Sequence, residues 1–140
     1  MKISARVENI HSTLRVSLDT NGVVHTLAIP PRASGLGSSV NGGELLFLAM
    51  ATCYCNDIYR EAARRGLRVS AVEVEVYGEF GSEGEPVRNV NYRAKVSGPA
   101  TEEALQNLML ATDRVAEIQN SIRAAIPVTL NKIEAVHEPS

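Results

Sequence analysis

The feature that most constrains this chain is a long apolar segment near its middle, ELLFLAMATCYCNDIYREAARR, at residues 44–65. Arg64 and Arg65 at its end suit the negative end of a helix dipole, and Gly66 follows as a stop signal. The apolar run from Leu45 to Cys55 is about half the length that a membrane span requires. We therefore predict one long helix inside a folded protein, with no membrane partner.

Segments with alternating polarity precede this helix. Leu14, Val16 and Leu18 alternate with polar neighbours, and Asn21-Gly22 follows, the pair that supplies positive φ in a tight hairpin turn. The segment VVHTLAIP completes this β-hairpin, and ISARVENI before it is predicted as a third strand. The stretch SGLGSSVNGG is too rich in glycine and serine for regular structure, so we predict a loop there.

A second pair of strands is predicted after the helix. The segments RVSAVEVEVYGEF and VRNVNYRAKVSG both alternate with a period of two, and the turn-rich GSEGEP joins them. Val72, Val74 and Val76 share one face of the first of these strands. Glu73 and Glu75 share the other face, which predicts one buried and one solvated side.

Two further helices and a last strand complete the predicted order. Thr101, followed by two glutamates, is typical of a helix start. The apolar stripe of that helix is Leu105, Leu108, Thr112, Val115 and Ile118. Asn120 or Ser121 is expected to cap a short helix before Pro127, after which PVTLNKIEAV is predicted as a closing strand. Because strands flank the helices without strict β–α–β alternation, we predict an α+β fold.

The length and net charge of the chain limit the classes of function that it can have. A chain of 140 residues that is 44% hydrophobic has the size of a single domain, so we expect one domain over residues 1–140. The formal net charge is −2 and the basic residues are scattered, so we predict no nucleic-acid partner. The N-terminal MKISARVENIHST has polar and charged residues where a secretory signal needs an apolar run, so we expect a cytoplasmic protein.

Both cysteines lie in the predicted long helix, within ATCYCND. Helical residues two apart point about 200° from one another, so Cys53 and Cys55 face different ways. Cys55 lies on a mostly apolar strip with Ile58, which predicts a small buried side chain. Cys53 lies where the apolar half of the helix gives way to a polar half beside Asp57, as a pocket wall would. From the helix alone, both a reactive thiol and a core residue remain open for Cys53.

Metal and disulfide chemistry fit ATCYCND less well. Structural zinc needs four ligands, and the histidines His11, His25 and His137 are far apart in the sequence, so we predict no metal. A disulfide between Cys53 and Cys55 would require the helix to unwind locally, because their Cβ atoms point apart. Two cysteines in a reducing compartment are also more often free thiols.

The N-terminal hairpin, the Gly/Ser loop and GGELLFLAMATCYCNDIYREAARRGL together resemble the OsmC/Ohr family over nearly the whole chain. Glu44, the small residues Ala49 and Ala51, Cys53 and the Arg-Arg-Gly-Leu end fall where the family has like residues. The resemblance implies an OsmC-like fold, no cofactor and an intertwined homodimer. Such a dimer would account for a helix that is apolar on almost every side.

The same resemblance implies thiol-dependent reduction of organic hydroperoxides through Cys53, which becomes a sulfenic acid. Glu44 and Arg15 are the candidates for the glutamate and arginine of the family's site. The family's second, resolving cysteine is missing, because Ala116 stands at its apparent position and Glu117 follows where proline is usual. An external dithiol reductant, or Cys55, is therefore expected to resolve the sulfenic acid.

Two other outcomes stay open. The chain retains the fold without peroxidase activity and binds a small hydrophobic ligand, or it is a structural dimer in which both cysteines are packing residues. The apolar side chains at the start of the long helix suit a ligand pocket as well as a peroxide pocket.

Overall fold

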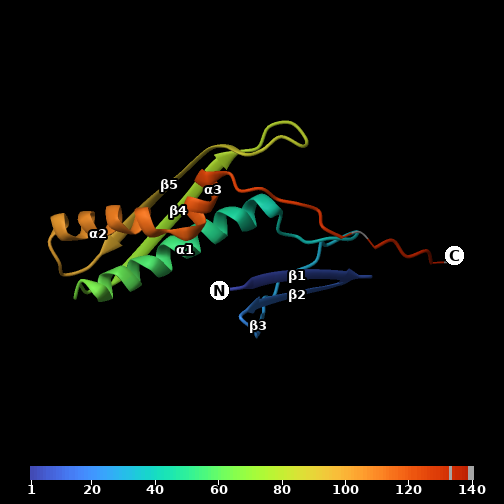
Figure 1. Cartoon of the computed structure of the whole chain (residues 1–140), viewed down its shortest axis with the longest axis horizontal. Helices are drawn as coiled ribbons and strands as arrows, with labels where there is room; N and C mark the ends of the chain where they lie inside the picture. The colour runs from blue at the N-terminus through green and yellow to red at the C-terminus, as the bar shows by residue number, and fades with distance from the viewer. Residues whose placement is uncertain (133, 139–140) are drawn as a thin grey trace. The chain divides into compact units, whose positions relative to one another are not determined.

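A computed structural model describes residues 1–132 and 134–138 (Figure 1). The elements along the chain are β1 (Ile3–Ile10), β2 (Thr13–Thr20), β3 (Val23–Thr26), α1 (Gly42–Arg64), β4 (Ala71–Glu79), β5 (Arg88–Ser97), α2 (Glu102–Val115) and α3 (Glu117–Ala124). The predicted α+β class and the antiparallel strands are confirmed. In the described part of the chain, no helix combines the length and the hydropathy that crossing a bilayer requires.

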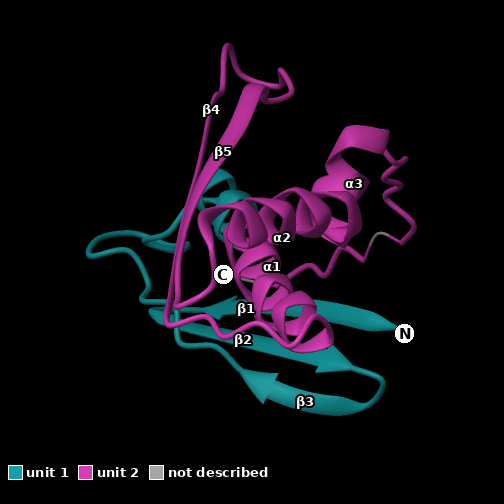
Figure 2. Ribbon diagram, turned by 90° about the vertical axis from the view of Figure 1, so that its left-hand side faces the viewer, with its two compact units in different colours: residues 1–48 teal, residues 49–140 magenta. Residues whose placement is uncertain are grey.

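The chain divides into two compact units, Met1–Leu48 (unit 1) and Ala49–Ser140 (unit 2), which Figure 2 colours separately. Unit 1 contains an antiparallel sheet in the order β1-β2-β3. Asn21 and Gly22 have φ values of 52° and 85°, as the predicted tight turn between β2 and β3 requires. The division into two compact units does not show whether residues 1–140 unfold cooperatively as one domain, so that expectation stays a prediction.

The sheet of unit 1 has two unlike faces. Val7 pairs with Val16 and Ala5 pairs with Leu18, so these side chains share one apolar face. Only part of this face is buried, since Val16 is 8% exposed and Val7 is 62% exposed. The opposite face is more polar, and on it Glu8 forms ion pairs with Arg6 and Arg15, whose side chains are exposed.

Unit 2 builds its core from the helices and the β4–β5 hairpin. The core cluster contains Tyr54, Ile58, Ala62, Leu108 and Ala116, each at most 3% exposed. The apolar face of the hairpin packs against this cluster through Val72, Val74, Val96 and Tyr92, as the alternating pattern of β4 predicted. The Tyr54 and Tyr92 rings meet edge to face with centroids 5.0 Å apart.

The long helix ends where the sequence predicted. Gly66 has a φ of +64°, and the Leu67 N–H donates to the Ala62 carbonyl at 2.9 Å, which closes the last turn. Helix α2 begins after Thr101, whose hydroxyl accepts from the Ala104 N–H at 3.1 Å.

Two local predictions were wrong. Helix α3 begins after Ala116 rather than at Asn120 or Ser121, because the Asn120 amide is used instead to donate to the Arg114 carbonyl at the end of α2. The closing strand predicted over residues 127–136 is absent from the described residues 126–132 and 134–138, which have no regular secondary structure. A strand needs a neighbouring strand for its backbone hydrogen bonds, and the pairings of the described strands include none with this segment.

Candidate functional site

The Cys53 thiol lies at the edge of the unit 2 core, next to two carboxylates. Its Sγ is 3.7 Å from Asp57 Oδ2 and 3.9 Å from Glu117 Oε2, so either oxygen is in range to accept from the single S–H. Asp57 follows Cys53 by one helical turn in α1, whereas Glu117 is the first residue of α3. The site therefore depends on the docking of α3 against α1.

Arg60 supplies the positive charge of this cluster. Its Nη1 is 3.1 Å from Asp57 Oδ1 and 3.7 Å from Glu117 Oε1, and its Nε is 3.4 Å from Glu61 Oε1. The guanidinium thus bridges carboxylates from both helices and holds α3 close to α1. Asp57 is 6% exposed, and a buried carboxylate of this kind needs such a partner.

The N-terminus of α3 meets the sulfur through its backbone. The Ile118 N–H donates to the Cys53 sulfur and favours the thiolate. Ala116, the residue at the apparent position of the resolving cysteine, is 0% exposed and belongs to the core cluster. Its methyl group fills that position without offering a second thiol.

The local electrostatics keep the Cys53 thiol protonated. Burial raises the pKa of Cys53, the nearby Asp57 and Glu117 carboxylates raise it further, and the Ile118 N–H only partly offsets them. Burial also raises the pKa of Asp57, with Glu117 adding to the rise and Arg60 opposing it.

Donor atoms of Cys53, Asp57 and Glu117 lie within 4.8 Å of one another, a spacing that a metal ion would accept. Arg60 already pairs with both carboxylates of this set, so the cluster carries its own counter-charge. We therefore assign no metal to this cluster, and the absence of a metal stays a prediction.

Cys53 lies at the border of the core beside Asp57, as the sequence predicted, whereas Cys55, predicted as a small buried side chain, is only partly buried. Both are free and partly buried, but it is Cys53 that packs against the core cluster. Cys55 lines a shallow depression with Thr52 and Val74. The reason is that the buried strip of α1 runs through Met50, Tyr54, Asp57, Ile58 and Glu61, and position 53 borders this strip more closely than position 55.

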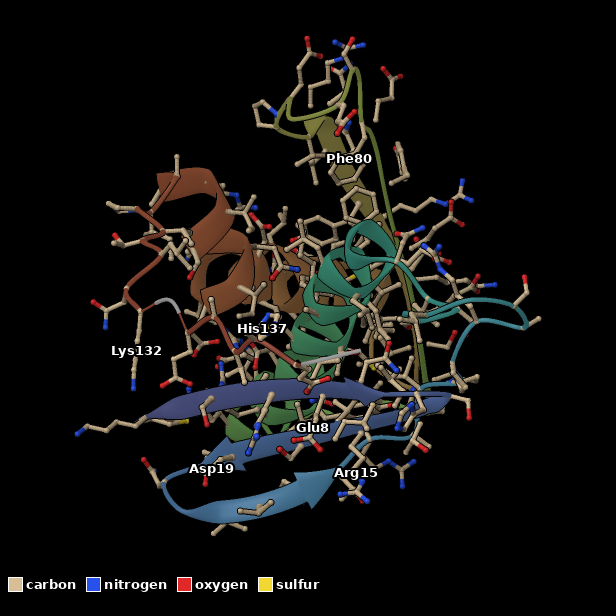
Figure 3. The ribbon with its side chains drawn as sticks, turned by 90° about the vertical axis from the view of Figure 1, so that its right-hand side faces the viewer. Glu8, Arg15, Asp19, Phe80, Lys132 and His137 are labelled. Atoms are coloured by element: carbon tan, nitrogen blue, oxygen red, sulfur yellow. The ribbon has the colours of Figure 1, made fainter. Side chains whose placement is uncertain are left out.

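Glu44 and Arg15, the other predicted site residues, have local partners. The Glu44 carboxylate accepts from the Asn41 N–H at 3.0 Å while Asn41 Oδ1 accepts from the Glu44 N–H at 2.8 Å, a reciprocal cap on the start of α1. Glu44 precedes Cys53 by nine residues in this helix, about 13 Å along its axis. Arg15 lies on the polar face of the unit 1 sheet, with its Nη1 3.8 Å from Glu8 Oε1 (Figure 3).

Sequence reasoning missed the role of Glu117 and of the Ile118 N–H. Glu117 stood out only as a departure from the family's pattern, and nothing in the sequence places it beside a thiol 64 residues earlier. Asp57 was detectable, because a spacing of four residues in a helix puts it on the face of Cys53.

Comparison with known proteins assigns the family. Residues 35–131 match the family model described as OsmC-like protein, so the chain belongs to the OsmC-like family. Among curated proteins, none matches the sequence.

Solved structures share the fold at low sequence identity. An organic hydroperoxide resistance protein from Elizabethkingia anophelis is 21% identical, with a TM-score of 0.60 over 88% of this chain and 89% of that one. An organic hydroperoxide resistance protein OsmC from Legionella pneumophila is 21% identical, with a TM-score of 0.58 over 88% of this chain and 90% of that one. An OsmC-like protein from Mycoplasma pneumoniae is 16% identical, with a TM-score of 0.59 over 87% and 86%. At these identities the likeness establishes the fold.

Proposed function

We propose that this protein reduces organic hydroperoxides with Cys53 and uses an external dithiol to return the oxidised sulfur to the thiol. The observation that carries the proposal is the position of the Cys53 sulfur, partly exposed and 3.7 and 3.9 Å from two carboxylate oxygens, in a chain of the OsmC-like family. Two structural relatives are named organic hydroperoxide resistance proteins, which supports the choice of substrate class.

The chemistry follows from these neighbours. The sulfur attacks the terminal peroxide oxygen, the O–O bond breaks, an alcohol leaves and Cys53 becomes a sulfenic acid. The thiol proton passes to the departing alkoxide through Asp57 or Glu117, since either is in range to accept from Sγ. Because the pKa of Cys53 is raised, removal of this proton is part of the reaction and is not complete beforehand.

Resolution by an external reductant fits the surroundings of the sulfur. Ala116 offers no thiol, and Cys55 lies on another side of α1. The two thiols of the reductant remove the sulfenic oxygen as water, leaving Cys53 as a thiol and the reductant as a disulfide. Such a cycle needs a reducing compartment, consistent with the expected cytoplasmic location.

The test follows consumption of cumene hydroperoxide by the reduced protein in excess dithiothreitol. We expect turnover by wild type and by Cys55→Ser, and none by Cys53→Ser. Loss of turnover in both variants would assign resolution to Cys55 and require α1 to fray. Absence of turnover in wild type would leave the alternative, an OsmC-like fold without peroxidase activity.

Arg15 and Glu44 stay proposals for the same site. Their hydrogen-bond and ion-pair partners, Glu8 for Arg15 and Asn41 for Glu44, explain their positions without reference to a peroxide. If either side chain takes part in the reaction, Arg15→Ala or Glu44→Gln lowers kcat/KM by more than any loss of folded protein explains. Equal turnover in wild type and variant would remove that residue from the site.

We also infer that the chain acts as a homodimer. Members of the family are typically dimers, and the single chain leaves many large apolar side chains exposed, including Ile3, Val7 and Leu48. A second copy is the partner that would cover them.

A further inference from the structure

A second hollow in unit 2 does not include the Cys53 sulfur. It has a volume of about 420 Å³ and is lined by Met50 of α1, Val90 and Tyr92 of β5, and Gln119 and Ile122 of α3, among others. This volume lies within the range of small-molecule sites, and the named walls are largely apolar. We call it the Gln119 hollow.

Gln119 is the unusual residue of this hollow. It is 1% exposed, and its Nε2 donates to the Met50 carbonyl at 2.9 Å. Its Oε1 is buried and has no hydrogen-bond partner among the described residues. Turning the amide over would set Oε1 against the Met50 carbonyl oxygen, so the bond to Met50 fixes Oε1 as an open acceptor. An unpaired buried acceptor is costly, which makes this atom a strong site for a donor.

Other polar groups of the wall are already engaged. The Tyr92 hydroxyl donates to Asp113, and burial together with that hydrogen bond raises the pKa of Tyr92, so the phenol stays protonated. The Arg123 guanidinium pairs with Asp113 and donates to Asn120 Oδ1 at 2.9 Å. Its charge is therefore offset, and an anionic ligand gains little from it.

We propose that the Gln119 hollow binds a neutral small molecule with an apolar body and one O–H or N–H donor, which bonds to Gln119 Oε1. The ligand's donor pairs with the acceptor that no described residue satisfies, while its apolar body covers Met50, Val90 and Ile122. The first turn of α3 separates this site from the thiol, because the Ile118 N–H meets Cys53 while the Gln119 amide meets Met50. The proposal does not rest on peroxidase chemistry.

The experiment compares benzyl alcohol with benzyl methyl ether, which lacks the donor, by titrating each into the full-length protein. The readouts are the NMR shifts of the Gln119 side-chain amide and of the Met50 methyl group. We expect both signals to move and the alcohol to bind roughly three- to tenfold more tightly, as one net hydrogen bond predicts. Absence of any shift at about 10 mM of either probe, or shifts confined to other residues, would overturn the proposal.

Variants separate the hydrogen bond from the cavity. In Gln119→Met the alcohol is expected to lose its advantage over the ether, whereas Gln106→Met, a matched change at an exposed glutamine of α2, keeps it. An unchanged preference in Gln119→Met contradicts the proposal. Because that variant also loses the bond to Met50, Ile122→Phe provides a second test: it leaves Gln119 in place, fills the hollow and should abolish binding of both probes.

Discussion

The two compact units differ in how far they bury their large apolar side chains. In unit 2, Tyr54, Ile58 and Leu108 are at most 3% exposed, whereas Ile3 and Val7 of unit 1 are 66% and 62% exposed. Unit 2 thus forms its own core from helices packed on a hairpin. Unit 1 has a sheet whose apolar face is mostly open within one chain, and an isolated three-stranded sheet needs that face covered.

This contrast indicates two different sources of stability. The core of unit 2 depends on contacts within the chain, and the same contacts hold the Cys53 site and the Gln119 hollow together. The apolar face of unit 1 is where a second copy would contribute most. Substitutions in unit 2 should therefore change folding, and substitutions on that face should change assembly.

The largest effect is expected for Met50→Asp in unit 2. Met50 is 4% exposed, so the new carboxylate would be buried without a partner, and we expect a loss of more than about 4 kcal/mol of unfolding free energy. Urea denaturation followed by circular dichroism measures it. The control is Leu110→Asp at a position that is 61% exposed, where the loss should stay within about 0.5 kcal/mol. Similar losses in the two variants would contradict the assignment of Met50 to a core.

An intermediate effect is expected for Val7→Asp in unit 1. This change should leave far-UV circular dichroism unaltered and weaken the proposed dimer at least tenfold, by about 1.4 kcal/mol or more, because a charge enters the face that a second copy would cover. Light scattering over a dilution series would then show the mass falling toward the 15.1 kDa of one chain.

The control for Val7→Asp is Ser4→Asp, on the polar face of the same strand, which should keep the dimer of wild type. If wild type is a monomer at about micromolar concentration, the proposed dimer is refuted, because a stable homodimer remains associated at that concentration. Equal dimer affinities in Val7→Asp and Ser4→Asp would instead move the interface to another surface.

Local features of both units were predictable from the sequence, and contacts between distant segments were not. Asn21-Gly22 and Gly66 specify their turns through their own backbone preferences, and the alternation in β4 assigns its buried face directly. The contact of Glu117 with Cys53 spans 64 residues, so no local pattern encodes it. The strand predicted at 127–136 is absent from the described residues, because alternating polarity produces a strand only where a neighbouring strand accepts and donates its backbone hydrogen bonds.

The smallest effect is expected when a charge beside Cys53 is removed. The experiment tests whether the packing of unit 2 holds Glu117 next to the thiol. Glu117 raises the pKa of Cys53, so in a Cys55→Ser background the change Glu117→Gln should lower that pKa. Alkylation by iodoacetamide requires the thiolate, so its rate against pH should rise to its plateau at lower pH in the variant. At neutral pH we expect the rate to increase roughly two- to tenfold, a modest gain because Glu117 is largely exposed and screened.

Glu102→Gln is the matched control, because Glu102 is likewise the first residue of its helix, α2, and both changes remove a favourable charge from a helix N-terminus. The control should leave the pH profile of Cys53 unchanged, which separates a direct effect on the thiol from a loss of helix stability. If Glu117→Gln and Glu102→Gln give the same profile, α3 does not dock its first turn against Cys53 in solution. Glu117 would then be absent from the site and Asp57 alone would carry the proton, while the core of unit 2, tested by Met50→Asp, would stand.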